Sequence, residues 1–312
     1  MVAQRARLAD GRLHLNHGPI DLIIEAFGPV DEVERAYDQA WMKFPDVLPA
    51  LTGELTLLRQ PIGSVRPIFA GPVARRMADA VWPHRAKFIT PMAAVAGAVA
   101  DETLAALIEG RALRKGYVND GGDIALHLTP GETFTAGIVG DLSAPAIDGR
   151  AEIDARSRVR GIATSGQGGR SFSLGIADAV TVLARSAAEA DAAATMIANA
   201  VNVEDAAIVR QPASAIDPDS DLGDRLVTLS VGALSPEAIA AALDAGEHEA
   251  GKLADAGLIL AAMLQLHKLR RIVTADGNPG SQISFDRRGN LPRGRAAPGA
   301  RAPARSPAGG DS

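Results

Sequence analysis

The segment EADAAATMIANAV, residues 189–201, carries polar side chains at a spacing that suits metal chemistry. Residues four apart share one face of a helix, so Asp191, Thr195 and Asn199 form a polar stripe on an otherwise apolar helix. A carboxylate and a hydroxyl one turn apart can both reach one hard cation. Magnesium prefers such oxygen ligands and completes its shell with water and substrate phosphates. The spacing predicts either a magnesium pair at Asp191 and Thr195 or a polar stripe that faces solvent.

The segment NDGGDI places two glycines between two aspartates. Glycine allows a close approach to a ligand or a positive φ, and the aspartates add oxygen ligands. The alternative is a plain hairpin turn, since this sequence lies between two apolar runs. The candidate ligand-binding residues here are Asn119, Asp120, Gly121, Gly122 and Asp123.

The segment TSGQGGRS, residues 164–171, is rich in glycine and hydroxyl groups. It lacks the GK[ST] ending of a P-loop, and a strand rather than a helix is expected after it, which excludes a dinucleotide-binding turn. Thr164, Ser165, Gly166 and Arg170 are candidates for an anion cradle. The alternative is a mobile surface loop. Asp178, farther along, either serves the site or caps the next strand.

Other kinds of site have little support in the sequence. The chain has no cysteine, which excludes disulfides, iron–sulfur clusters, thiolate zinc sites and a cysteine nucleophile. The six histidines are scattered without the spacing of a metal-binding pair. We identify no activated nucleophile, so the catalytic residues are unknown from the sequence.

The composition indicates a globular protein. The 312 residues suit one large domain, 47% of them are hydrophobic, and only 4% are aromatic. The net charge of −5 does not suggest a nucleic-acid-binding protein. The N-terminal segment has no apolar run of signal-peptide length, and we find no stretch that should span a membrane. We therefore expect a cytoplasmic protein.

The order of predicted elements is typical of an α+β fold. Helices are expected over 31–58, with breaks at Pro45 and Pro49, and over 73–82, 90–110, 187–201 and 237–271. Residues 186–189 form a capping box, and Arg270 and Arg271 are expected to end the last helix. Strands are expected in LRKGYVNDGGDIALHL, TFTAGIVGDL, VRGIATSG, ADAVTVLA and RLVTLSVG.

Two segments differ from the rest in composition. Residues 93–100, AAVAGAVA, would leave a helix nearly bare, so another backbone or a ligand should come close to Ala96 and Gly97. Residues 287–312 contain six Arg and one Asp, a charge of +5 that leaves −10 on the rest, and are rich in Pro, Gly and Ala. We expect one domain over 1–286 and a disordered tail over 287–312, which is either a solvated extension or a contact for RNA or an acidic partner.

The segments TPMAAVAGAVADE, NDGGDI, ATSG, ADAVTV and ADAAAT, in this order, resemble a bacterial and archaeal protein family of the ApbE-like superfamily. The resemblance covers roughly residues 17–201. It implies a mixed sheet packed with helices. ApbE enzymes use magnesium to move FMN from FAD to a threonine of a target protein, with release of AMP. The resemblance therefore implies Mg²⁺ at Asp191 and Thr195, an FAD, FMN or adenine-nucleotide ligand, and an acceptor protein as partner.

The chain also departs from the ApbE pattern. It has Ala96-Gly97 where those enzymes have Lys-Gly, and GQGGRSFSLGI replaces a stretch that contains a histidine. Arg170 is a loose counterpart of that histidine. Three alternatives stay open: a magnesium-dependent flavin or nucleotidyl transferase, a non-catalytic flavin-binding or accessory protein, and an enzyme of sulfur or cofactor metabolism that reuses the fold.

Overall fold

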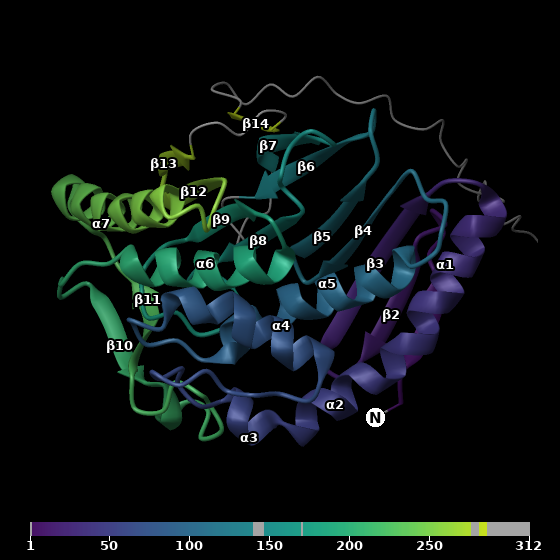
Figure 1. Ribbon diagram of the computed structural model, residues 1–312. Coiled ribbons are helices and arrows are strands. Elements are labelled where there is room, and N and C mark those ends of the chain that lie inside the picture. Colours follow the sequence, from purple (N-terminus) through teal and green to yellow (C-terminus); the bar gives the residue numbers. More distant parts are fainter. Residues whose placement is uncertain (1, 140–146, 170, 276–280, 286–312) are drawn as a thin grey trace, which may run out of the picture.

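The computed structural model describes residues 2–139, 147–169, 171–275 and 281–285 (Figure 1). The helices are α1 (Val30–Lys43), α2 (Val47–Gly53), α3 (Leu55–Leu58), α4 (Pro72–Val81), α5 (Val95–Ile108), α6 (Ala187–Ala200) and α7 (Pro236–Asp255), with short 3-10 helices η1 (Phe44–Asp46), η2 (Trp82–His84), η3 (Pro91–Ala94) and η4 (Ala213–Ala215). The strands are β1 (Gln4–Arg7), β2 (Leu13–His17), β3 (Ile20–Phe27), β4 (Lys115–Asp120), β5 (Asp123–Leu128), β6 (Thr133–Val139), β7 (Ile147–Asp154), β8 (Gly161–Ser165), β9 (Ala179–Ala184), β10 (Ile208–Pro212), β11 (Leu226–Val231), β12 (Ala261–Leu266), β13 (Leu269–Thr274) and β14 (Ser281–Phe285). The predicted tail and Arg170 lie outside the described residues.

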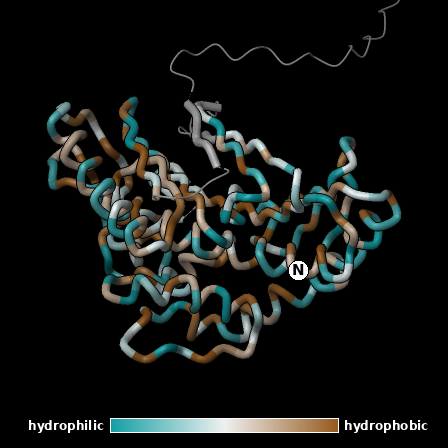
Figure 2. Tube along the Cα trace, turned by 45° about the horizontal axis from the view of Figure 1, so that its top comes forward, coloured by the Kyte–Doolittle hydropathy of each residue, from teal (hydrophilic) through white to brown (hydrophobic). Residues whose placement is uncertain are grey.

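One large antiparallel sheet organises the described strands. It has nine strands in the order β1-β2-β3-β4-β5-β8-β9-β12-β13, while β10 pairs with β11 and β7 lies between β14 and β6. Burial alternates along β2 and β3, as expected for strands with one face on a core. Figure 2 shows hydrophobic and hydrophilic residues alternating along the trace. The α+β class predicted from the sequence is confirmed.

The large sheet has a core on each face. The helices lie over one face, and the small sheet of β6, β7 and β14 lies over the other (Figure 1). Val118 and Ala125 belong to the core under the helices, whereas Leu126, Ile162 and Leu183 belong to the core on the opposite face. Because side chains alternate along a strand, this assignment also fixes the direction of the polar residues at the strand ends.

Helix α6 is enclosed by close backbone contacts on several sides. A Cβ atom at Gly97 of α5 would overlap the Ala187 backbone, one at Gly161 of β8 would overlap Ser186, and one at Gly175 would overlap the Ala198 carbonyl oxygen. Most of the buried residues of α6 are alanines. The close approach predicted at Gly97 is therefore confirmed, and the partner is the first turn of another helix.

The prediction of one long helix over 237–271 is wrong for the second half of that range. Helix α7 ends at Asp255, and residues 261–274 form the hairpin of β12 and β13. Gly257 has φ 68°, its N–H bonds to the Ala254 carbonyl, and the Leu258 N–H bonds to the Leu253 carbonyl. This pair of backbone hydrogen bonds is a Schellman motif, which ends a helix.

Arg270 and Arg271 consequently lie on strand β13 and do not end a helix. The turn before them is formed by His267, which adopts φ 52°, and Lys268. No Gly or Asn marks this turn. Gly246 and Gly251 both lie inside α7, where Gly246 packs against Val201.

Other predicted elements are confirmed. Helix α6 begins after Ser186, whose hydroxyl accepts a hydrogen bond from the Glu189 N–H (3.2 Å). The hairpin around residues 121–122 joins β4 and β5. Contrary to the sequence-based expectation, the segment Pro91–Ile108 is long and apolar enough to cross a membrane by composition alone, but half of it is buried in this fold. This match is weak evidence, since a core helix passes the same test.

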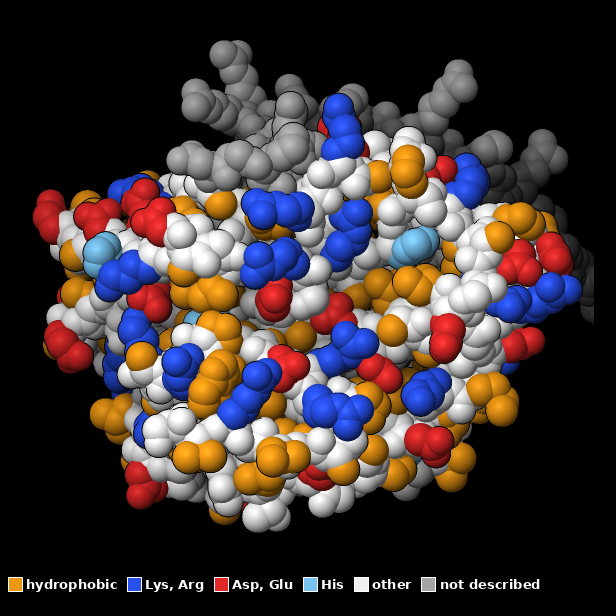
Figure 3. Space-filling model, viewed as in Figure 1, with side chains coloured by type: hydrophobic (Ala, Val, Ile, Leu, Met, Phe, Trp, Pro, Cys, Tyr) orange, Lys and Arg blue, Asp and Glu red, His pale blue; other side chains and the backbone are white. Residues whose placement is uncertain are grey.

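Figure 3 shows basic and acidic side chains interspersed on the helix-covered side of the molecule. Some of them form ion pairs, such as Arg76 of α4 with Glu102 of α5 (2.9 Å) and Arg185 with Glu189 at the start of α6 (3.6 Å). Exposed pairs of this kind contribute about 0–1 kcal/mol each. The packing of the helices therefore rests mainly on the apolar contacts beneath these charges.

Candidate functional site

Two buried aspartates flank the tight turn between β4 and β5. Asp120 and Asp123 are 4% and 9% exposed, and they pair across a turn in which Gly121 and Gly122 have φ 62° and 116°. Both aspartates alternate in phase with Val118 and Ala125, so both point to the helix side of the sheet. The turn therefore brings two carboxyl groups close together under the helices.

Asn119 has a different place from the two aspartates. Its position in β4 directs the side chain to the opposite face of the sheet. Its Oδ1 accepts a hydrogen bond from the Gly122 N–H (2.8 Å), which closes the turn. Among the residues predicted in this segment, Asn119 therefore shapes the turn, and the aspartates supply the acidic groups.

Asp191, in the second turn of α6, joins the two aspartates of the hairpin. Its Oδ2 accepts a hydrogen bond from the Gly97 N–H (3.1 Å), at the start of α5. The carboxyl groups of Asp191 and Asp123 lie close enough to affect each other's pKa. Asp191 and the two hairpin aspartates therefore form one buried acidic group.

Burial dominates the electrostatics of this acidic cluster, defined as Asp120, Asp123 and Asp191. Desolvation raises the pKa of Asp191 to about 7, against the opposing effect of the Gly97 N–H. Desolvation and then the charge of Asp191 raise the pKa of Asp123 well above its usual range, and the charge of Asp120 adds to both shifts. The cluster is thus a place where negative charge is costly and a cation would be favourable.

The residues of the polar stripe predicted on α6 differ in their hydrogen bonding. Thr195 is partly buried, and within the described part of the chain its hydroxyl has no hydrogen-bond partner. Asn199, one turn later, is occupied, because its Oδ1 accepts a hydrogen bond from the Leu174 N–H (3.0 Å). The arrangement leaves an available hydroxyl one turn from the acidic cluster.

The TSGQGG segment begins with the last two residues of β8 and continues beyond the end of that strand. The Thr164 N–H donates to Asp123 Oδ1 (3.3 Å), but its hydroxyl bonds to the Thr181 hydroxyl (2.9 Å). Thr164 alternates in phase with Ile162, so this hydroxyl lies on the face away from α6. Ser165 is partly buried and Gly166 is buried, and both directly follow Thr164, the residue of the predicted cradle whose N–H contacts Asp123.

Asp101 is a partly buried carboxyl group that the sequence did not single out. From the second turn of α5, its two oxygens accept hydrogen bonds from the Ala187 and Ala188 N–H groups at the start of α6 (3.0 and 2.9 Å). Asp191 of α6 accepts in turn from the Gly97 N–H at the start of α5. The two helices therefore cap each other. The only signal in the sequence was an aspartate inside an apolar helix.

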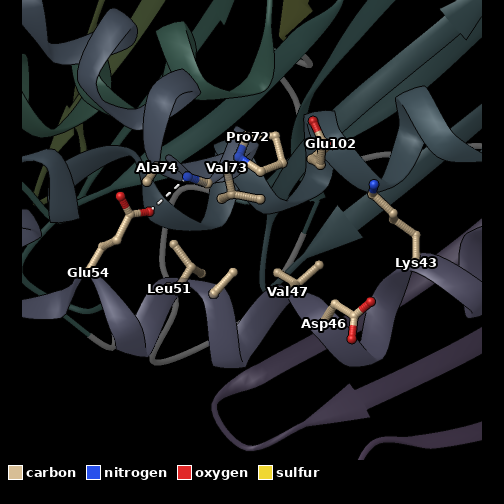
Figure 4. A pocket seen from close by; sticks show the side chains of 11 residues that line it. Lys43, Asp46, Val47, Leu51, Glu54, Pro72, Val73, Ala74 and Glu102 are labelled. Atoms are coloured by element: carbon tan, nitrogen blue, oxygen red, sulfur yellow. Dashed lines mark hydrogen bonds between the residues drawn. The ribbon is translucent and has the colours of Figure 1, made fainter. Parts of the chain in front are cut away.

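The cavities found among the described residues lie away from the acidic cluster. One of about 100 Å³ lies between α2 and α4 (Figure 4) and is lined by Lys43, Asp46, Val47, Ala50, Leu51, Glu54, Gly71, Pro72, Val73, Ala74 and Glu102. Its Glu54 carboxylate is occupied by the Ala70 and Gly71 N–H groups (2.7 and 3.0 Å). A shallow hollow of about 220 Å³ borders α1. Both are smaller than the roughly 300–1,000 Å³ of typical ligand pockets, so we give more weight to the chemistry of the cluster.

No group of three or more His, Asp or Glu side chains among the described residues is arranged to hold a metal ion. The acidic cluster is therefore not a closed all-protein metal site. Asp191 and Thr195 could supply two oxygen ligands, and the remaining ligands of a bound magnesium ion would come from water or from a phosphate-bearing molecule.

Two solved flavin transferases show a distant likeness to this chain. The apo form of the flavinyl transferase ApbE of Pseudomonas stutzeri has 11% identity and a TM-score of 0.44, with coverage of 88% of this chain and 94% of that one. The flavin transferase ApbE of Vibrio cholerae has 12% identity and a TM-score of 0.44, with coverage of 88% and 98%. At these values we draw no argument from the likeness.

Sequence relatives and a family model give a closer match. The UPF0280 protein of Methanothrix thermoacetophila is 35% identical over 159 residues, which are 51% of this chain and 63% of that protein. The UPF0280 protein of Methanothermobacter thermautotrophicus is 37% identical over 153 residues, 46% of this chain and 54% of that protein. The matches thus span less than two thirds of these relatives. The family model described as AbpE bacteria matches residues 5–278, and the chain belongs to this family.

Proposed function

We propose that this chain binds the pyrophosphate group of FAD, or of a similar adenine nucleotide, together with a magnesium ion at Asp191 and Thr195. The observation that carries the proposal is the partly buried Thr195 hydroxyl, which has no partner within the described residues and lies one helical turn from an acidic cluster. The resemblance to ApbE enzymes in the stretch ADAVTV and ADAAAT supports the same pair.

The residues fit magnesium in their chemistry. Carboxylate and hydroxyl oxygens are hard ligands, and two of them leave room for the waters and phosphate oxygens that magnesium usually keeps. Asp120 adds negative charge beside Asp191. The two cavities described above lie elsewhere, so the proposal for this chain concerns the pyrophosphate end of the ligand.

Each group then has a stated task. Asp191 and Thr195 hold the metal ion, which neutralises charge on the bound phosphates. Ser165 and Gly166 and the residues after them face the phosphate end as a small-residue loop. The buried turn of Asp120 and Asp123 keeps the cluster acidic and keeps bulk water away from it.

The chemistry beyond binding has two candidate forms. In the transferase form, a hydroxyl of an acceptor protein receives the FMN part of FAD and AMP leaves. In the accessory form, the chain binds flavin without transfer. The site favours the accessory form in one respect, because Gly97 packs against α6 and its neighbour is Ala96, where ApbE enzymes have a lysine.

Calorimetry with FAD tests the binding proposal. FAD should bind more tightly with magnesium than with EDTA, because the metal joins the carboxylate to the phosphates. Thr195→Val keeps the size of the side chain and removes its hydroxyl, so it should reduce the difference by roughly tenfold in Kd, about 1.4 kcal/mol. Equal binding with magnesium and with EDTA, or no binding at all, would contradict the proposal.

Release of AMP from FAD separates the two forms. With magnesium and candidate acceptor proteins present, the transferase form requires AMP and a flavin-labelled acceptor in equal amounts. Magnesium-dependent FAD binding without AMP release would leave the accessory form as the function of this chain.

A further inference from the structure

Leu174 lies in the irregular chain between β8 and β9, and its backbone N–H and carbonyl groups both form hydrogen bonds with side chains. Its N–H donates to Asn199 Oδ1 (3.0 Å). Its carbonyl oxygen accepts from Arg210 Nη1 (2.8 Å) and from Asn202 Nδ2 (3.2 Å). Three side chains therefore hold the backbone of Leu174 in place, in a segment without regular secondary structure.

The chain on either side of Leu174 follows the end of helix α6 closely. Gly175 passes so near that a Cβ atom there would overlap the Ala198 carbonyl oxygen. The Ile176 N–H donates to the Val201 carbonyl (2.9 Å), and the Ser173 carbonyl accepts from the Thr228 N–H of β11 (2.9 Å). The loop therefore satisfies groups at the helix end that would otherwise lack partners.

Arg210 of β10 is the centre of this arrangement. Its guanidinium group is partly buried and donates in two directions, to the Leu174 carbonyl and to Asn202 Oδ1 (2.5 Å). Within the described residues it forms no ion pair with a carboxylate. A planar guanidinium group can hold two acceptors in fixed geometry, whereas a lysine ammonium cannot do so as rigidly.

The opposite flank of the same loop carries the predicted anion cradle. The Gln167 N–H donates to the Ala177 carbonyl (2.8 Å), which brings the two flanks of the loop together. Asp191 and Asn199 lie on one stripe of α6, roughly 12 Å apart along the helix axis at 1.5 Å per residue. Helix α6 thus contributes Asp191 to the acidic cluster near its start and contacts the loop near its end.

We infer that Arg210, with Asn199 and Asn202, is the positioning group that fixes residues 173–176 against the end of α6 and, through the contact of Gln167 with Ala177, helps to set the place of Ser165 and Gly166, which directly follow the residue that contacts Asp123. The part of this inference that concerns ligand binding rests on the proposed function. The part that concerns the loop itself does not, and it can be measured in the protein without ligand.

Hydrogen–deuterium exchange of the ligand-free protein tests the loop. In Arg210→Gln, the amides of Leu174 and Ile176 should exchange at least tenfold faster, while those of β9 and β12 keep their protection. Arg225→Gln is the matched control, because Arg225 directly precedes the neighbouring strand β11 and its guanidinium lies over the Phe88 ring without contact to Leu174. Unchanged exchange at Leu174 and Ile176 in Arg210→Gln would overturn the inference.

A second pair of variants covers the case in which Arg210→Gln unfolds. Asn199→Asp keeps an oxygen that accepts the Leu174 N–H, so it should retain protection of that amide, whereas Asn199→Leu should lose it. Equal exchange in the two Asn199 variants would overturn the inference without reference to Arg210.

FAD binding then separates this inference from the proposed function. If the wild-type chain binds FAD with magnesium, Arg210→Gln should weaken binding by roughly tenfold, and equal binding together with a loosened loop would overturn the positioning role. If the wild-type chain binds no FAD, the proposed function fails, and the exchange data alone decide whether Arg210 positions the loop.

Discussion

The first turns of α5 and α6 are capped in the same way but have different surroundings. Asp101 of α5 accepts hydrogen bonds from two N–H groups of α6, and Asp191 of α6 accepts one from the Gly97 N–H of α5. The charges that act on Asp101 are that of the cation Arg76 and, to a smaller extent, that of Glu189. The charge that acts on Asp191 is that of Asp120.

This difference distinguishes a structural carboxylate from a candidate metal ligand. Burial raises the pKa of both groups. At Asp101, the two N–H groups and the charge of Arg76 oppose the effect of burial. At Asp191, the Gly97 N–H opposes the effect of burial, while the charge of Asp120 adds to the cost of a negative charge. We infer that only Asp191 gains from a cation, although both aspartates cap a helix.

Substitution of Gly97 should disturb both caps and have the largest effect on stability. A Cβ atom there would overlap the Ala187 backbone, which cannot move without shifting the start of α6. Gly97→Ala should lower the free energy of unfolding by about 3 kcal/mol, at the upper end of overpacking costs, and Gly97→Leu by more. Chemical denaturation measures this change.

Gly251 provides the control for this substitution. It lies in helix α7 with nothing within 4 Å of an added Cβ. Gly251→Ala should therefore stabilise the chain by about 0.5–1 kcal/mol through helix propensity alone. A similar effect of alanine at both positions would contradict the close contact between α5 and α6.

The same conservative change at the two capping aspartates should have opposite effects. Asp101→Asn removes one of two acceptors at the start of α6 and should cost about 1–2 kcal/mol. Asp191→Asn keeps an acceptor for the Gly97 N–H and removes a charge from an acidic cluster, so at pH 8 it should be neutral or stabilising. Thermal melts of both variants at pH 8 provide the measurement, and equal losses would remove the distinction.

Asp123→Asn should change the pH dependence of stability. The folded pKa of Asp123 lies well above its usual value of 3.8. A carboxyl group with a raised folded pKa contributes stability below its unfolded pKa, and that contribution is lost as pH rises through the folded pKa. The asparagine still accepts from the Thr164 N–H. It should therefore stabilise the chain at pH 8 by on the order of 1 kcal/mol and have little effect at pH 4.

Urea unfolding of the wild-type chain and of Asp123→Asn across this pH range checks that expectation. The two stability curves should converge at acid pH and separate as the pH rises. Parallel curves would mean that the pKa of Asp123 is not raised in the folded chain.

Local signals in the sequence predicted much of the site. The capping box marked the start of α6, the Asp-Gly-Gly-Asp turn marked the hairpin, and four-residue spacing placed Asp191 and Thr195 on one face. Each of these features depends on residues close together in the chain. The bare run around Gly97 also predicted a close contact, because its cause is the absence of side chains.

Features that depend on distant residues could not be predicted in this way. Asp101 caps residues that lie 86 and 87 positions later, and no local pattern points to them. The face to which Thr164 points depends on the register of β8 in the sheet. The stop at Gly257 had a local signal, a glycine before an apolar run, but the helical pattern before it concealed the change to a strand.

The most direct test of the difference between the two carboxyl groups is FAD calorimetry, with magnesium and with EDTA, on Asp191→Ala and Asp101→Ala. We expect Asp191→Ala to abolish the magnesium dependence of FAD binding. Asp101→Ala should retain that dependence in its folded fraction, despite its lower stability. Retained magnesium dependence in Asp191→Ala, or its loss in a folded Asp101→Ala protein, would contradict the assignment of Asp191 as the metal ligand.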